Sequence, residues 1–142
     1  KKGTIIDMKI IGIEHVGIAV DDLEETSSFW GDILRIANTH TEKVESEGVN
    51  TKIFDTGKGK IELLDSLEEY SPIRKFLHKR GPGIHHLCLE VEDINIAIKE
   101  LKESKIQTIN ENPTIGAEGY KIVFIHPKFT GGVLVELAEK PI

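Results

Sequence analysis

The sequence contains only one cysteine, Cys88, among its 142 residues. A single thiol excludes a disulfide bond within the chain and agrees with a reducing compartment. Basic residues are also scarce, since 18 Lys and Arg stand against 24 Asp and Glu and leave a net charge of −6. Because a phosphate backbone requires a basic surface, we expect no nucleic-acid partner.

Long apolar runs are absent as well. No stretch approaches the roughly 20 apolar residues of a membrane span. Residues 1–11 lack the apolar core and the cleavage site of a signal peptide. The composition, 39% hydrophobic and 30% charged, is that of an ordinary soluble domain. We therefore expect no membrane partner and a cytoplasmic location, or an organellar matrix if a targeting segment has been removed.

What the sequence does contain is an internal repeat. Residues 12–23 recur as residues 83–94, with five of twelve positions identical. Each copy is followed by an apolar run that holds one carboxylate, Glu62 in the first and Glu136 in the second. His15 and Glu62 are 47 residues apart, and His86 and Glu136 are 50 apart. The two halves of the chain are therefore built to one plan.

The alternation of side chains gives these four residues a common property. Successive side chains of a strand point to opposite faces. Both histidines and both glutamates alternate with branched aliphatic residues, so each leaves the aliphatic face of its strand. A glutamate buried in such a strand is costly unless it is paired or coordinated. The pattern predicts that His15, Glu62, His86 and Glu136 converge at the pseudo-twofold seam and bind one divalent metal ion.

Capping residues and apolar periodicity predict the remaining elements. Asp93 precedes a helix with a clear apolar stripe, and Asp22 precedes a weaker one at the equivalent position. Ser71 and Pro72 begin a helix between the two halves. Short strands are expected at residues 49–54, 60–64, 106–110, 122–126 and 133–137. The sequence thus predicts one α+β domain over residues 1–142. It comprises two tandem βαβββ modules, at about 10–67 and 83–139, and a helical linker at about 68–82.

The other histidines and the cysteine are not expected to be metal ligands. His85 lies on the opposite face from His86 by parity, and we expect it to pack or to face solvent. Cys88 is expected to line the cavity as a small side chain, because a soft thiolate is unusual beside two carboxylates. The remaining histidines are expected at the surface or in a turn: His40, His78 and His126.

Taken together, these motifs resemble the vicinal oxygen chelate (glyoxalase/bleomycin resistance) superfamily over about residues 10–139. Within it, several stretches resemble the pattern of the methylmalonyl-CoA epimerase family: residues 13–20, 71–77, 83–87, 116–119 and 126–137. The resemblance implies a glyoxalase-like curved mixed sheet, a half-barrel around a metal site. It also implies metal ligands at His15, His86 and Glu136, with Glu62 as the fourth.

The function implied is an isomerase that interconverts (R)- and (S)-methylmalonyl-CoA by 1,1-proton transfer through a metal-stabilised enolate. The resemblance also implies a second base, a glutamate, on the strand that begins near residue 49. This chain has Thr51 there, and Glu45 and Glu47 precede the strand. We therefore expect Glu136 as one base and Glu62 as the candidate for the opposite face.

Two imidazoles and two carboxylates suit cobalt, which we expect first, or nickel, manganese or zinc. The partners expected are a small acyl-CoA substrate and a second copy of the chain in a homodimer. The alternatives are a glyoxalase I-type lactoylglutathione lyase acting on a glutathione hemithioacetal and a non-catalytic small-molecule-binding module. An extradiol dioxygenase would need only two histidines and one carboxylate, so Glu62 counts against it.

Overall fold

The computed structural model describes residues 7–142. Two predictions include residues 1–6: the absence of a signal peptide in residues 1–11 and the single domain over residues 1–142. For residues 1–6 both lie outside the described residues. The described chain forms two compact units. Unit 2 contains His15–His86 with Gly116–Glu118, and unit 1 contains the rest. Within residues 7–142 no helix combines the length and the apolarity that a bilayer crossing requires.

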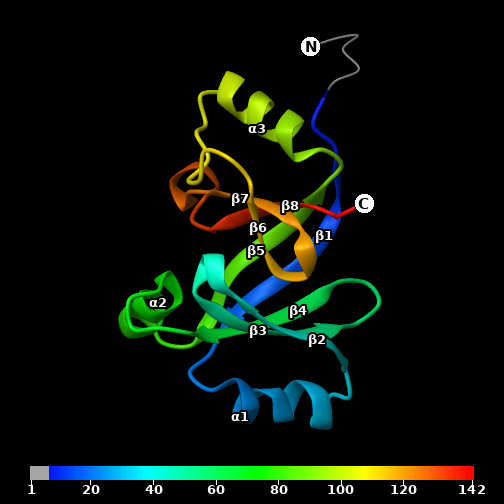
Figure 1. Ribbon diagram of the computed structural model, residues 1–142, viewed down its shortest axis with the longest axis vertical. Helices are drawn as coiled ribbons and strands as arrows, with labels where there is room; N and C mark the ends of the chain where they lie inside the picture. Colours follow the sequence, from blue (N-terminus) through cyan, green and yellow to red (C-terminus); the bar gives the residue numbers. More distant parts are fainter. Residues whose placement is uncertain (1–6) are drawn as a thin grey trace. The chain divides into compact units, whose positions relative to one another are not determined.

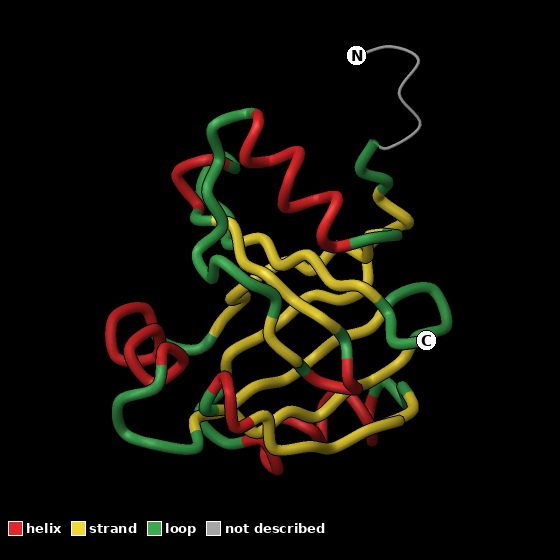
Figure 2. The backbone as a smooth tube through the Cα atoms, turned by 45° about the horizontal axis from the view of Figure 1, so that its top comes forward, coloured by secondary structure: helices red, strands yellow, loops and turns green. Residues whose placement is uncertain are grey.

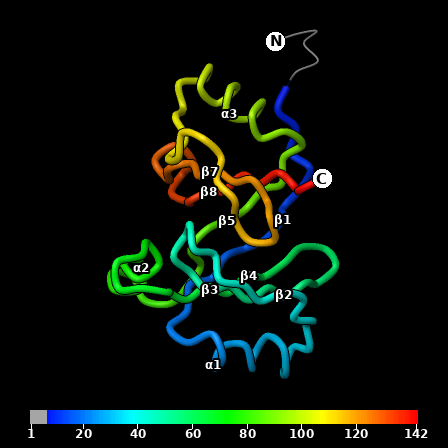
Figure 3. Tube along the Cα trace, in the orientation of Figure 1, coloured from blue at the N-terminus to red at the C-terminus, as the bar shows by residue number. Residues whose placement is uncertain are grey.

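Within residues 7–142, eight strands pair in the order β2-β3-β4-β1-β5-β8-β7-β6. Two strands contribute to both units. β1 (Ile10–Ala19) begins in unit 1 and ends in unit 2, whereas β5 (Gly83–Val91) begins in unit 2 and ends in unit 1. Figure 3 follows both strands by their colours along the chain, and Figure 2 distinguishes the helices, in red, from the strands, in yellow.

Unit 2 is built on the end of β1, the beginning of β5 and three further strands: β2 (Ala37–Val44), β3 (Val49–Asp55) and β4 (Lys60–Ser66). β1 pairs with β4 in parallel, and β3 pairs with β2 and β4 antiparallel. A 3-10 turn, Glu45–Glu47, joins β2 to β3. In β3 burial alternates, since Val49, Thr51 and Ile53 are buried while Asn50 and Lys52 are half-buried, as in a strand with one covered face.

Two helices pack on the unit 2 sheet through their apolar residues. Asp22 caps α1 (Leu23–Ser27), which continues as a π-helical segment, Ser28–Ile33. α1 lies against one face of β3 and β4 (Figure 1), and Leu23 packs there with Phe54 and Leu63. The linker helix α2 (Pro72–Arg80) begins at the predicted Ser71 cap and packs on a separate cluster.

Unit 1 contains β8 (Val135–Glu139), which pairs in parallel with β5 and antiparallel with β7 (Lys121–Ile125). The short β6 (Thr114–Ile115) pairs with β7. The helix α3 (Ile94–Glu103) begins at Asp93, whose side chain accepts hydrogen bonds from the backbone of the first turn, as the sequence predicts. Two 3-10 turns complete the elements: Ala117–Gly119, divided between the units, and Pro127–Phe129.

The strand predicted at residues 106–110 is wrong. Ile109 N–H donates one backbone hydrogen bond to Phe124, 2.7 Å away. Beyond it, the side chain of Asn110 binds the backbone of β7 in place of a strand, accepting from Phe124 N–H at 2.9 Å and donating to the Ile122 carbonyl at 3.0 Å. An amide side chain that satisfies the neighbouring strand removes the need for an extended ladder.

The α+β fold class is confirmed, because each half of the chain has the order strand, helix and three strands. β2 supplies the third short strand of the first half, at a position for which no range was predicted. The module boundaries remain a prediction. The compact units do not follow them, since Gly116–Glu118 of the second module belongs to unit 2.

Candidate metal centre

Three of the four predicted ligands lie together in unit 2, where β1, β4 and β5 supply one each. His15 Nε2 is 2.8 Å from Glu62 Oε1, and His86 Nε2 is 3.7 Å from the same oxygen. The two imidazole Nε2 atoms are 3.0 Å apart. All three residues are buried, with 8%, 4% and 4% of the surface of His15, Glu62 and His86 exposed. Side chains 47 and 71 residues apart in sequence thus direct three donor atoms to one point.

The register of β1 and β4 explains part of this convergence. Gly17 on β1 is the partner of Glu62 on β4. His15 is two residues before Gly17 on the same strand, so its side chain leaves the same face as that of Glu62. Gly17 itself leaves room for His86, because a Cβ atom at residue 17 would lie 2.1 Å from His86 Cε1. The glycine is therefore required by the imidazole ring packed over it.

The electrostatics of the cluster favour an ionised carboxylate. Burial alone would raise the pKa of Glu62, but the charge and hydrogen bond of His15, followed by those of His86, lower this pKa well below its ordinary value. A buried carboxylate needs such partners or a cation. The cluster thus holds a negative charge at a point where two imidazole nitrogens also converge.

These donors fit a divalent metal ion. Adjacent ligands of an octahedral ion with bonds of about 2.1 Å lie about 3 Å apart. The three donor atoms are separated by 2.8, 3.0 and 3.7 Å. Two neutral imidazoles and a carboxylate form a mixed nitrogen and oxygen set of the kind that binds first-row transition metals. The cluster His15, Glu62 and His86 is therefore a candidate metal centre.

Glu136, the fourth predicted ligand, lies on β8 in unit 1. It is buried, with 6% of its surface exposed, and its cross-strand neighbours are Cys88 and Phe124. Its burial on a strand is the environment that the sequence predicts for it. Because it belongs to the other compact unit, its part in the metal centre is a proposal.

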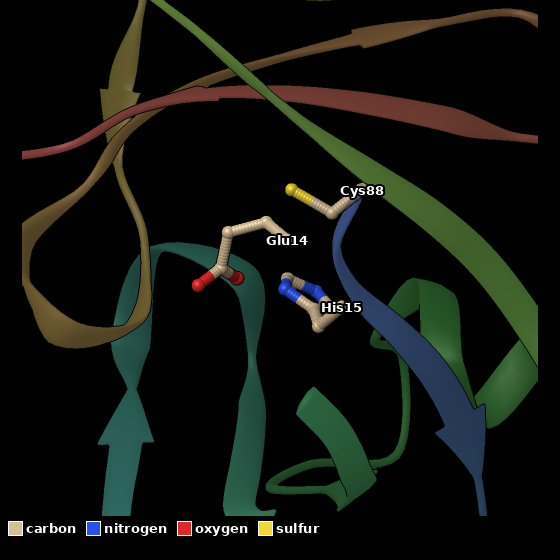
Figure 4. Close-up of side chains that lie close together, drawn as sticks. All are labelled: Glu14, His15 and Cys88. Atoms are coloured by element: carbon tan, nitrogen blue, oxygen red, sulfur yellow. The ribbon is translucent and has the colours of Figure 1, made fainter. Parts of the chain in front are cut away.

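A second group of potential ligands includes the beginning of β1. Glu14 and Cys88 of unit 1 offer ligand atoms within 4.8 Å of each other. Figure 4 shows both side chains, with His15 as the next residue along β1. Cys88 is fully buried and packs with Ile122 and Ala138, which agrees with its expected role as a small buried side chain. A soft thiol beside a hard carboxylate is an unusual ligand pair, so we assign no metal to this group.

The other histidines lie largely as the sequence predicts. His78 is exposed on α2, and His126 forms a turn in which its Nδ1 accepts a hydrogen bond from Lys128 N–H at 3.0 Å. His85 packs edge-on against Phe76 with ring centroids 4.9 Å apart, and it also contacts His86.

His40 and Glu42 on β2 form a polar pair that was not predicted from the sequence. His40 Nε2 is 2.6 Å from Glu42 Oε1, and the same oxygen accepts from Glu118 N–H at 3.0 Å. Thr51, where the resemblance implies a glutamate, is buried, and its Oγ1 donates to the Glu42 carbonyl at 3.2 Å. The sequence signal that could have predicted this pair is the alternation of His40, Glu42 and Val44, which places them on one face of a strand. It can be used only if residues 37–44 are recognised as a strand.

The chain is similar to known proteins over most of its length. Residues 14–124 match the family model of the Glyoxalase/Bleomycin resistance protein/Dioxygenase superfamily. The mitochondrial methylmalonyl-CoA epimerase of Mus musculus is 41% identical over 132 residues, which cover 92% of this chain and 74% of the relative. The matched ranges are long enough to include most of the described fold.

Two solved structures support the same likeness. The methylmalonyl-CoA epimerase from Mycobacterium tuberculosis has a TM-score of 0.90 and 36% identity, over 94% of this chain and 90% of that chain. A methylmalonyl-CoA epimerase in complex with methylmalonyl-CoA and NH4+ has a TM-score of 0.88 and 30% identity, over 93% of this chain and 96% of that chain. The predicted fold and the predicted family are both confirmed.

Proposed function

Because the chain belongs to the methylmalonyl-CoA epimerase family of the Glyoxalase/Bleomycin resistance protein/Dioxygenase superfamily, we propose that it interconverts (R)- and (S)-methylmalonyl-CoA. It is an isomerase that acts on an acyl-CoA. The relatives carry this name, and one of them is solved in complex with methylmalonyl-CoA. The observation that carries the proposal is the buried convergence of His15, Glu62 and His86, which suits a reaction that develops negative charge.

We assign the ligands of one divalent metal ion to His15, Glu62, His86 and Glu136. The first three are supported by their donor-atom separations of 2.8 to 3.7 Å. Glu136 is supported by its burial and by its place in the repeat. It follows His86 by 50 residues, much as Glu62 follows His15 by 47. Such an ion supplies a Lewis acid that stabilises charge developing on the thioester oxygen of the substrate. Cobalt is the metal proposed first, with nickel, manganese and zinc as alternatives.

The residues of the chain move the proton. Epimerisation removes the proton on the carbon between the thioester and the carboxylate and returns one from the other face. We propose Glu136 as the base on one face, because a carboxylate has a second oxygen to offer when one is engaged. Glu62 is the symmetry-related candidate for the opposite face. The buried surroundings of Glu62 exclude water from this part of unit 2.

The test follows the α-proton. The purified protein is given methylmalonyl-CoA in deuterium oxide, and the α-position is observed by NMR. We expect deuterium to enter while one epimer converts to the other. If the α-proton and the stereocentre stay unchanged while a glutathione hemithioacetal is turned over, the lactoylglutathione lyase is the correct function. If neither compound reacts in the metal-loaded protein, a non-catalytic binding module remains.

The assembly and the compartment are also proposals. We propose a homodimer. Its support is that Ile11 and Ile13 on β1 are each 60% exposed and provide apolar surface for a second copy. We propose a cytoplasmic location, or an organellar matrix, since the mouse relative is named as mitochondrial.

A further inference from the structure

The proposed reaction needs two proton-transfer groups, because the α-proton leaves one face of the substrate and returns to the other. Glu62, named above for one face, is the weaker candidate, since both imidazoles contact its Oε1 and only 4% of the residue is exposed. Thr51 has no group that takes up a proton at neutral pH. We therefore look for a more accessible residue of unit 2 for the second face, and this step rests on the proposed function.

The strand register brings a histidine to the face that carries Glu62. Glu62 on β4 pairs with Ile53 on β3, and Ile53 pairs with His40 on β2. Cross-strand partners point to the same side of a sheet. His40 and Glu62 therefore lie in one row on one face, two strand spacings or about 10 Å apart at the backbone. This row makes His40 a candidate to act on a substrate bound near Glu62.

The bond between His40 and Glu42 prepares the imidazole to accept a proton. A carboxylate only accepts hydrogen bonds, so the 2.6 Å contact assigns the proton of neutral His40 to Nε2. Nδ1 then carries the free lone pair. A carboxylate that fixes the tautomer of a histidine in this way is a recurring device for a general base.

Further contacts fix Glu42 in place. Its Oε1 accepts from Glu118 N–H at 3.0 Å, and the Glu118 carboxylate is paired with Lys60 Nζ at 3.0 Å. The His40 side chain nevertheless remains 36% exposed, against 10% for His15. His40 is therefore accessible enough to exchange its proton with water between turnovers.

We infer that His40, held by Glu42, is the proton-transfer group on the second face of the substrate's α-carbon. When His40 acts as the base, the α-C–H bond breaks, its proton passes to Nδ1, and its electron pair delocalises into the thioester. A proton from the group on the opposite face, proposed above as Glu136, then forms the new C–H bond. His40 releases its proton to water and Glu136 regains one. The reverse reaction exchanges the two roles.

The experiment uses His40→Gln in the metal-loaded protein, because glutamine can still donate a hydrogen bond to Glu42. Each epimer of methylmalonyl-CoA is given separately in deuterium oxide, and both α-proton exchange and inversion are measured. We expect inversion to fall about 100-fold or more in both directions. For the epimer whose α-proton faces His40, α-proton exchange should fall as much as inversion does. The other epimer should retain α-proton exchange near the parent rate.

Glu42→Gln is the second variant. It should slow exchange of the same epimer by about 10-fold, because the imidazole loses its charged partner. His78→Gln on the exposed face of α2 is the matched control and should behave as the parent. Metal content and melting temperature are measured for every variant.

Exchange of both epimers at the parent rate in His40→Gln would overturn the inference. An equal loss for both epimers would do so as well, because a structural role affects the two faces alike. A parent protein that exchanges neither epimer would refute the proposed function instead, so the two failures are distinguishable.

Discussion

The Nδ1 atoms of His85 and His86 lie 2.9 Å apart, so two consecutive residues of β5 hydrogen-bond through their rings. His86 Nε2 is turned toward Glu62, and its other nitrogen is held by His85. His85 is itself fixed by the ring of Phe76. A partner of this kind orients a metal-binding imidazole and fixes its tautomer.

Replacing His85 should therefore weaken metal binding without removing a ligand. We expect His85→Ala to lower metal affinity about 10-fold or more, the effect typical of such partners. The measurement is competition with a chromophoric chelator, accompanied by the melting temperature of the metal-loaded protein. His78→Ala, a change of an exposed histidine, should leave the affinity unchanged. An unchanged affinity in His85→Ala would show that the ring of His86 is oriented by other contacts.

Gly17 should be intolerant of any side chain. A Cβ atom there would lie 2.1 Å from His86 Cε1, so Gly17→Ala must displace the ring. We expect a loss of about 1–3 kcal/mol in the free energy of unfolding, together with weaker metal binding. Gly12→Ala on the same strand is the control, since no atom lies within 4 Å of its added Cβ. Denaturant unfolding and metal titration of both variants check the prediction, and equal behaviour of the two would contradict it.

The ligand assignment predicts the metal content of single variants. His86→Ala and Glu136→Ala should each lose stoichiometric metal when purified beside the parent and assayed by elemental analysis. The reason is that each removes one donor from a small set. Glu25→Ala, an exposed residue of α1, should keep its metal. Full metal occupancy in Glu136→Ala with unchanged stability would exclude Glu136 from the site.

Asn110 should contribute measurable stability to unit 1. Its side chain makes three hydrogen bonds to backbone groups, those of Asn112, Ile122 and Phe124. Because buried backbone groups lose their partners, Asn110→Ala should cost about 1–3 kcal/mol. Asn112→Ala retains the backbone carbonyl that Asn110 binds and should be nearly neutral. Equal unfolding midpoints for the two variants would contradict this role.

The homodimer predicts a mass in solution close to twice 15.8 kDa. Light scattering at micromolar concentration measures it directly. If Ile11 and Ile13 provide the contact, Ile13→Lys should shift the protein toward the monomer, because a charge would be buried in an apolar surface. Ile84→Lys alters an isoleucine of similar exposure, 68%, and serves as a comparison. A monomeric mass for the parent would exclude the dimer.

The sequence by itself determined the elements that depend on local chemistry. Asp93 and Ser71 begin their helices where they were expected, because a short polar side chain satisfies the first turn of a helix regardless of the rest of the fold. The alternation around Glu62 placed it off the aliphatic face, because side chains alternate along any strand. The repeat identified His15, Glu62, His86 and Glu136 as equivalent pairs.

Only the tertiary structure decided which side chains meet. Gly17 is required because the ring of His86, 69 residues away in sequence, packs over it. The rings of His85 and His86 are in contact although strand alternation predicts opposite faces for the two residues. His40 and Glu42 form a pair on β2, a strand that the sequence analysis did not predict because its residues are mostly polar. Asn110 ended a predicted strand by bonding to β7, a partner that local sequence does not show. Register between strands fixes the place of His86 over Gly17, and register depends on the packing of the whole sheet.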